Sequence, residues 1–268
     1  MTRRRLGQNF LVDRAAIARI VEALDPGPRD AVVEIGPGHG ALTGPLIERA
    51  GRVVAVELDA RLAAALRQRF GEEVLLLRTG DVLEHDLPAL AAEAGRGTSA
   101  RVLVVGNLPY SISKPVAMRL VAARHAVSRA VLMFQREVAE RLTAEPCTAS
   151  YGPLSVLCQL AYRIERCFDL PPSAFRPSPA VRSTVTRWSP REESTLAPAL
   201  EPRLRASLRA CFARRRQTLR NNLRAALGAD TAAALLRQSG LAPTRRAEQL
   251  EAQEFVRLAE LWPRSGLV

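Results

Sequence analysis

Between about residues 30 and 135, short apolar runs alternate with stretches of helical periodicity, and this alternation constrains the fold more than any other feature. The apolar runs are nearly continuous, as in strands covered on both faces, and each helical stretch is long enough to cross back over a sheet. The expected strands are Ala31–Ile35, Val53–Glu57, Val74–Arg78, Val102–Gly106 and Ala130–Phe134, with helices over Ala41–Ala50 and Arg61–Phe70. The pattern predicts an α/β fold with a mostly parallel sheet.

After Tyr151 the pattern changes. A helical stretch to about Tyr162 leads to a strand-like run near Cys167, then to a proline-rich loop and the alternating strand Val181–Trp188. Alternation of apolar and polar residues is typical of a strand with one solvated face. We therefore expect these two strands to close the sheet as an antiparallel edge hairpin.

The rest of the chain is predicted to be helical. Residues 189–202 hold three prolines among polar residues and are predicted to be a linker. Helical periodicity then covers Arg203–Leu227, Asp230–Ser239 and Ala247–Leu261. We expect a large domain over residues 1–188 and a small, basic, all-helical RNA-binding domain over residues 203–268.

A glycine-rich turn follows the first predicted strand. Ala31–Ile35 runs directly into Gly36-Pro37-Gly38-His39-Gly40 and then into a helix, which is typical of nucleotide-type sites. The spacing is not that of dinucleotide sites, and no P-loop Lys-Ser/Thr follows, which argues against pyrophosphate and triphosphate ligands. Taken alone, the glycines fit a plain tight turn equally well.

Two carboxylates follow the next two strands. Glu57 ends the second strand, where it can accept hydrogen bonds from both hydroxyls of a ribose, and Asp81 follows the third, where it can accept one from an adenine amino group. Singly, such residues are more often helix caps or solvated loop acids. Together with Gly36 and Gly38 at successive carboxyl ends of strands, they favour an adenosine-type ligand.

The most specific motif is Asn107-Leu108-Pro109-Tyr110, after the fourth strand. The amino nitrogen of adenine is a poor nucleophile because its lone pair is delocalised into the ring. The Asn107 side-chain oxygen and the Pro109 carbonyl can hold both of its N–H groups and favour a pyramidal nitrogen during attack on a sulfonium methyl group. Tyr110 can stack on the extracted base, so no general base is required. The alternative is an ordinary turn with a buried tyrosine.

Basic charge predicts a polyanionic partner. The chain has 39 Lys and Arg against 27 acidic residues, a net charge of +12, and residues 191–268 carry a net +6 of it. If residues 203–227 form one helix, spacings of 4, 7 and 4 residues place four arginines on one face, with two more beside them. These expected phosphate contacts are Arg205, Arg209, Arg216 and Arg220, then Arg214 and Arg215. The alternative is a merely solvated charged face.

Seven segments give the chain a resemblance to the bacterial small-subunit (16S) rRNA adenine dimethyltransferase family. They are GQNFL (7–11), EIGPGHGALT (34–43), GNLPYSISKP (106–115), QREVAERL (135–142), YGPLSV (151–156), FRPSPAVRSTV (175–185) and RRRQTLRNNL (214–223). They cover nearly the whole chain, and the last distinguishes it from the related large-subunit resistance methylases. The resemblance implies a Rossmann-like class I methyltransferase that uses S-adenosylmethionine. It also implies dimethylation of two adjacent adenosines near the 3′ end of small-subunit rRNA, in a late pre-30S particle.

The resemblance also implies roles for individual residues. Asn9 and Leu11 are expected to line the methionine end of the cofactor, with Gly36 and Gly38 at its backbone turn. Glu57 is expected to contact the ribose and Asp81 the adenine of the cofactor, and Asn107 is expected to bind at the junction of cofactor and target base. Phe175 falls at the position of a second aromatic residue, which suggests that the adenine lies between Tyr110 and Phe175. Phe175 could instead anchor its proline-rich loop in the core.

Other features narrow the range of functions. The four cysteines show no CxxC spacing and the three histidines stand alone, so no metal site is expected. No apolar run approaches the roughly 20 residues of a membrane span, and the N-terminus lacks signal-peptide features. We expect a cytoplasmic monomer. Two alternatives stay open: an adenine methyltransferase acting on large-subunit rRNA, and a ribosome-assembly factor that keeps the fold.

Overall fold

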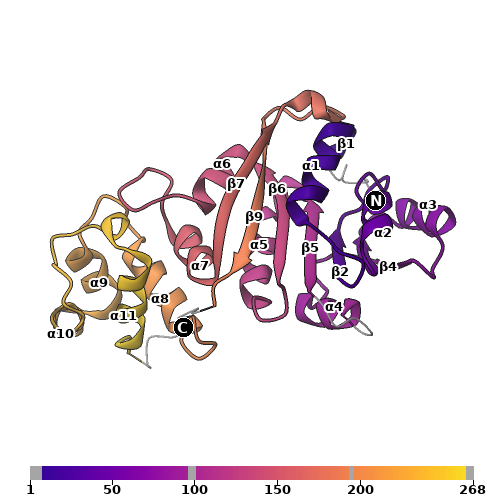
Figure 1. The fold of residues 1–268 in the computed structure, drawn as a ribbon. Helices are drawn as coiled ribbons and strands as arrows, with labels where there is room; N and C mark the ends of the chain where they lie inside the picture. The colour runs from indigo at the N-terminus through magenta and orange to yellow at the C-terminus, as the bar shows by residue number, and fades with distance from the viewer. Residues whose placement is uncertain (1–7, 96–100, 193–195, 264–268) are drawn as a thin grey trace, which may run out of the picture. The chain divides into compact units, whose positions relative to one another are not determined.

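The fold is described for residues 8–95, 101–192 and 196–263 of a computed structural model (Figure 1). The ends of the predicted domains and residues 193–195 of the predicted linker lie outside the described residues. Within these ranges, seven strands form one sheet in the order β4-β3-β2-β5-β6-β9-β7, and β1 pairs with β8 in a separate small sheet. The strands are β1 (Phe10–Leu11), β2 (Ala31–Ile35), β3 (Arg52–Glu57), β4 (Leu75–Thr79), β5 (Val102–Asn107), β6 (Arg129–Gln135), β7 (Tyr162–Leu170), β8 (Phe175–Arg176) and β9 (Ser183–Pro190).

The sheet confirms the predicted fold class. Strands β4, β3, β2, β5 and β6 pair in parallel, and β9 pairs with β6 in antiparallel register, with Met133 opposite Val185. β7 follows β9 at the edge, so the two form the expected antiparallel hairpin. β2 lies in the middle of the sheet and is buried along its whole length, which explains why all of its residues but Glu34 are apolar.

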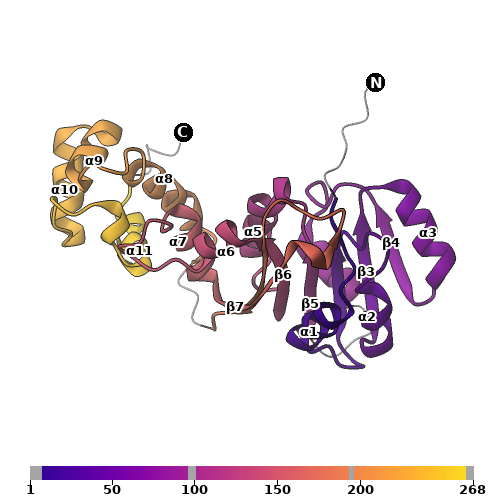
Figure 2. The ribbon, with the colours of Figure 1, turned by 90° about the horizontal axis from the view of Figure 1, so that it is seen from above.

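Helices cover both faces of the sheet. α1 (Arg14–Leu24) and α2 (Thr43–Arg49) pack on one face, while α4 (Leu87–Ala94) and α5 (Ser113–Ala122) pack on the other, as Figure 2 shows for α1, α2 and α5. α3 (Ala60–Phe70) packs against β3 and β4. Fully buried side chains such as Ile20, Leu46 and Val105 fill the core, and burying each contributes roughly 1.5–3 kcal/mol.

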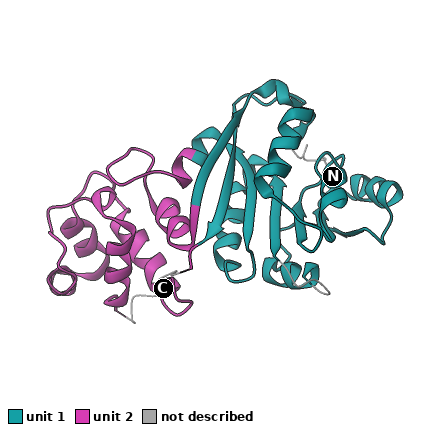
Figure 3. Ribbon diagram, in the orientation of Figure 1, with its two compact units in different colours: residues 1–139, 164–190 teal, residues 140–163, 191–268 magenta. Residues whose placement is uncertain are grey.

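The described chain packs into two compact units (Figure 3). Unit 1 holds residues 1–139 and 164–190, and unit 2 holds residues 140–163 and 191–268. The packing differs from the predicted division at residues 140–163, which join the C-terminal helices rather than the sheet domain. Tyr151 donates a hydrogen bond from its hydroxyl to the carbonyl of Leu250 at 2.9 Å, a contact that local sequence periodicity does not reveal.

Unit 2 is helical. Its helices are the end of α6 (Arg136–Leu142), α7 (Pro153–Ala161), α8 (Glu201–Cys211), α9 (Leu219–Leu227), α10 (Ala229–Ser239) and α11 (Ala252–Glu260). α7 packs against α8 and α11, and α9 packs against α10. The last two predicted helical segments are observed as α10 and α11, the latter preceded by a 3₁₀ turn.

The prediction of one helix over Arg203–Leu227 is wrong, because α8 ends at Cys211 and α9 begins at Leu219. The buried side chain of Asn222 donates to the carbonyls of Cys211 at 2.7 Å and Arg214 at 3.1 Å, which fixes the connecting turn. Thr218 then caps α9 by accepting from the backbone N–H of Asn221. A side-chain clamp and a new cap thus interrupt the helical backbone.

Candidate active site

The carboxyl ends of β2, β3, β4 and β5 bring the predicted residues to one edge of the sheet. Because these four strands are parallel neighbours, their following loops lie side by side. The loops carry the glycine turn after β2, Glu57 at the end of β3, Asp81 after β4 and Asn107 at the end of β5. The structure therefore brings together the residues whose roles were inferred from spacing.

The glycine turn approaches the N-terminal segment closely. Gly36 and Gly38 have φ values of 67° and 58°, which favour glycine. A Cβ atom on Gly38 would lie 2.9 Å from the ring of Phe10, so a larger residue would displace that ring. The turn can therefore present its backbone to a ligand.

Glu57 ties the turn to β3. Its side chain is buried, and its Oε2 accepts from the backbone N–H of Gly38 at 2.9 Å while its Oε1 accepts from that of Asp59 at 2.9 Å. Each carboxylate oxygen retains capacity for a further hydrogen bond. Glu57 also lines both cavities described below, so its fixed carboxylate can accept further hydrogen bonds from within them.

The first cavity lies around Asp81, a half-buried residue whose Oδ1 accepts from the backbone N–H of Leu83 at 2.8 Å. It encloses about 570 Å³, part of it open to solvent. Its apolar lining includes Val56, Leu58, Val82 and Ile112. A flat, apolar ring with one amino group fits such a lining.

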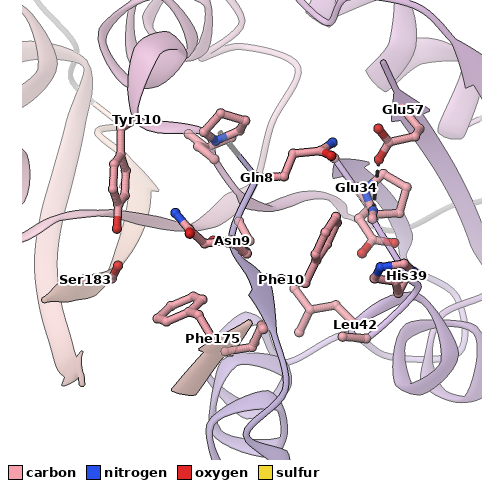
Figure 4. A pocket seen from close by; sticks show the side chains of 18 residues that line it. Gln8, Asn9, Phe10, Glu34, His39, Leu42, Glu57, Tyr110, Phe175 and Ser183 are labelled. Atoms are coloured by element: carbon pink, nitrogen blue, oxygen red, sulfur yellow. Dashed lines mark hydrogen bonds between the residues drawn. The ribbon is translucent and has the colours of Figure 1, made fainter. Parts of the chain in front are cut away.

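The second cavity adjoins the first and holds about 710 Å³, part of it open to solvent. The two share Gln8, Gly36, Glu57 and Pro109 in their walls. Figure 4 shows Tyr110, Phe175 and Ser183 on one side of the second cavity and Glu34, Glu57 and His39 on the other. Asn9 and Phe10 lie between these groups. The cavity thus has an aromatic side and a carboxylate side.

Asn107 has a fixed amide orientation. Its Nδ2 donates to the backbone carbonyl of Asn9 at 2.8 Å, so its Oδ1 is left to accept another hydrogen bond within the cavity that it lines. The Pro109 carbonyl already accepts from the N–H of Ile112 at 3.1 Å and has a second lone pair. Both acceptors of the predicted mechanism therefore have capacity for the N–H groups of an adenine.

Phe175 is more deeply buried than a free stacking platform would be. Only 1% of it is exposed, and β8 pairs it in register with Leu11 of β1, which is buried at 5% exposure. Phe175 both lines the second cavity and belongs to the hydrophobic core. Its role against the target base stays a prediction, beside Tyr110, which is half-buried.

Sequence reasoning assigned no role to four polar residues that line this cavity, namely Gln8, Glu34, His39 and Ser183. Glu34 is fully buried and its Oε2 accepts from the Thr43 hydroxyl at 2.7 Å. Burial raises the pKa of Glu34 to about 7; the Thr43 hydrogen bond lowers it and the nearby Glu57 raises it further. The signal in the sequence was a glutamate within an otherwise apolar strand.

The predicted RNA-binding arginines do not share one helix face, because three of them lie outside α8 and α9. Arg205 and Arg209 are on α8, Arg220 is on α9, and Arg214, Arg215 and Arg216 are in the intervening turn. Arg205 pairs with Glu201 at 2.6 Å, and Arg215 pairs with Glu248 at 2.8 Å. Arg209, Arg214, Arg216 and Arg220 are exposed.

Comparison with known proteins decides the family. The family described as ribosomal RNA adenine dimethylase matches residues 1–263. The chain belongs to this family. Family membership makes it an enzyme that methylates adenine in ribosomal RNA with S-adenosylmethionine as the methyl donor, as the sequence motifs predicted.

Individual proteins similar to this adenine dimethylase are also named as RNA methyltransferases or dimethyladenosine transferases. The chain is 45% identical to the ribosomal RNA small subunit methyltransferase A of Burkholderia sp, over 96% of this chain and 91% of that protein. It is 45% identical to the protein of the same name from Acidobacterium capsulatum, over 96% and 89%. The dimethyladenosine transferase of Plasmodium falciparum shares the fold with a TM-score of 0.77 and 25% identity, over 93% of this chain and 95% of that one. The 23S rRNA methyltransferase ErmE has a TM-score of 0.69 and 26% identity, over 95% and 99%.

Two further findings concern metals and membranes. Within the described ranges, no group of three or more His, Cys, Asp and Glu side chains is arranged to hold a metal ion. None of the helices found there is long and apolar enough to cross a membrane.

Proposed function

We propose that this enzyme transfers methyl groups to the N6 atoms of two adjacent adenosines in the 3′-terminal hairpin of 16S rRNA, within a pre-30S particle. Relatives that are 41–45% identical over at least 95% of the chain are named for the small ribosomal subunit. The segment RRRQTLRNNL, over residues 214–223, also favours the small subunit by resemblance. The product expected is N6,N6-dimethyladenosine.

The two cavities suit S-adenosylmethionine. Asp81 and its apolar neighbours would hold the adenine, Glu57 the ribose hydroxyls, and Asn9 and Leu11 the methionine end in the second cavity. The open lone pairs on Glu57 and the close backbone approach at Gly38 fit such a ligand. When bound, the cofactor supplies an electrophilic methyl group on a sulfonium.

The aromatic side of the second cavity would receive the target base. Tyr110 and Phe175 would contact the faces of an adenine taken out of its stack. The Asn107 Oδ1 and the Pro109 carbonyl would accept its two N–H groups, which orients the nitrogen lone pair for attack. The single observation that carries this proposal is the hydrogen bond from Asn107 Nδ2 to the Asn9 carbonyl, because it leaves the amide oxygen as acceptor.

The test is methylation of defined particles. We would incubate the protein with labelled S-adenosylmethionine and unmethylated small or large ribosomal subunits, then digest the RNA and identify the nucleosides. Label in dimethyladenosine of the small-subunit RNA alone supports the proposal. Label confined to large-subunit RNA would show that the target lies in the large subunit instead. Binding to particles without any labelled nucleoside would favour a role in ribosome assembly.

Unit 2 is the proposed RNA-binding part. Arg209, Arg214, Arg216 and Arg220 are exposed on α8, on α9 and in the turn between them, where guanidinium groups can contact phosphates. The Asn222 clamp holds the backbone of this turn. Arg205 and Arg215 form ion pairs with Glu201 and Glu248, so they would contribute less to phosphate contact than these four arginines.

The double charge reversal Arg216→Glu and Arg220→Glu should weaken RNA binding and flatten its salt dependence. If each arginine neutralises one phosphate, the slope of log affinity against log salt should become shallower by roughly 1.4 to 1.8. Filter binding to a 3′-terminal 16S fragment at several salt concentrations measures this. The matched control reverses the charges of Arg29 and Arg49. These exposed residues precede the amino ends of β2 and β3, whereas the cavities lie at the carboxyl ends of the strands. Equal slopes for both variants would remove these two arginines from the RNA interface.

A further inference from the structure

Glu34 is a buried acid in the wall of the proposed cofactor cavity. It lies on β2, in register with Ala55 of β3 and Val105 of β5, and 1% of it is exposed. The Thr43 hydroxyl donates to its Oε2 at 2.7 Å. Apolar strands flank the carboxyl, yet it borders a cavity of about 710 Å³.

Among the residues that the structure describes, no cation neutralises Glu34. Glu57 faces it from the end of β3, and the exposed His39 lies on the same side of the cavity, from the glycine turn (Figure 4). α2 contributes only the Thr43 hydroxyl, and β5 contributes Val105. Burial raises the pKa of Glu34 to about 7. A positive ligand in the cavity would therefore favour the ionised form of Glu34.

We propose that Glu34 determines the preference of the cavity for the positively charged methyl donor over its uncharged-sulfur product. The inference rests on the proposed placement of S-adenosylmethionine. Donor and product share the adenosine, ammonium and carboxylate groups, and they differ by the sulfonium charge. An ionised carboxylate in a poorly solvated cavity attracts that charge, whereas a protonated Glu34 does not. Loss of the charge on methyl transfer would then weaken the hold on the product and assist its release.

The preference must follow the protonation of Glu34. Binding and ionisation are linked reciprocally, so the donor expels the proton of Glu34 more completely than the product does. The ratio of the product Kd to the donor Kd cancels the groups that the two ligands share. We expect this ratio to rise roughly three- to tenfold between about pH 6 and pH 8, the size expected for two charges near each other in a medium of intermediate dielectric constant.

The experiment is isothermal titration of the full-length protein with S-adenosylmethionine and with S-adenosylhomocysteine near pH 6, 7 and 8. Wild type should show the rising ratio, and Glu34→Gln should show a flat one. Glu48→Gln, the same substitution at an exposed site on α2, should keep the rise. His39→Asn should also keep it, which separates the effect of Glu34 from any effect of the histidine on that side of the cavity.

Two further measurements keep the proposal testable if Glu34→Gln fails to fold. Thr43→Val removes the hydrogen bond that lowers the pKa of Glu34, so the rise should move to higher pH. Wild type titrated near pH 7 in buffers of different ionisation enthalpy should release more protons with the donor than with the product. A flat ratio in wild type, or a rise lost in His39→Asn, overturns the proposal while leaving the cofactor site intact. Failure of both ligands to bind overturns this proposal and the proposed function together.

Discussion

Replacing Asn107 with alanine should lower the rate of methyl transfer roughly 10²- to 10³-fold at saturating cofactor and RNA, the size of effect expected when a preorganised polar group leaves an active site. The alanine removes the Oδ1 acceptor that would orient the adenine amino group. Pro109 still offers its carbonyl, so one of the two N–H groups keeps its partner. The base would still enter the cavity, but the lone pair of its amino nitrogen would no longer be oriented toward the methyl group of the cofactor.

The variant should bind RNA as the wild type does, because the proposed phosphate contacts lie in unit 2. Its affinity for the cofactor must be measured separately, since Asn107 also donates to the Asn9 carbonyl and helps to hold the N-terminal segment. Single-turnover rates at saturating cofactor separate this effect from chemistry. Activity within about threefold of wild type would mean that Asn107 does not orient the amino group, and the proposed mechanism would then fail.

The parallel sheet and the placement of its site residues were predictable from sequence. Strands buried on both faces favour apolar side chains at most positions, so β2 and β5 stand out as nearly continuous apolar runs without any knowledge of their neighbours. Once the strands are parallel, the residues after them must meet at one edge, which places Glu57, Asp81 and Asn107 together.

What the sequence did not reveal depends on contacts between distant segments. The helix break near Cys211 relies on the side chain of Asn222 reaching back 11 residues, and nothing local distinguishes that asparagine from a solvated one. Residues 140–163 join unit 2 because α7 packs against α8 and α11, which follow the edge strands in the chain. Periodicity identifies an apolar helix, but it does not identify the partner against which the helix packs.

Glu34 is a different case, because the sequence analysis gave it no role although the residue stands out in the sequence. A glutamate within Ala31–Ile35 contradicts the apolar pattern that identifies the strand. Burial of a carboxyl costs free energy unless it is protonated or paired, so such a residue is a candidate for a functional role. The structure adds what the sequence lacked, namely the Thr43 hydroxyl and the neighbouring cavity.

Glu34→Gln should change how stability depends on pH. Burial raises the pKa of Glu34 from the ordinary 4.5 to about 7, so between these values the folded protein keeps a proton that the unfolded chain releases. Wild type therefore loses stability from this group as the pH rises from about 4.5 to 7, and the loss is complete above that range. At 1.36 kcal/mol per pKa unit, the shift corresponds to roughly 3 kcal/mol. Glutamine is neutral throughout and still accepts from Thr43, so it escapes this loss.

The difference in unfolding free energy between Glu34→Gln and wild type should thus shift by about 2.5 kcal/mol in favour of the variant between pH 5 and pH 8. Urea denaturation in a Trp262→Phe background measures it for unit 1, because Trp188 of β9 then reports alone. Comparing the two pH values cancels any packing cost of the amide, which is the same at both. Glu48→Gln is the matched control on an exposed site and should show no shift. A pH-independent difference for Glu34→Gln would mean that the carboxyl is already ionised in the folded protein at pH 5, and the cofactor preference could then not rise between pH 6 and pH 8.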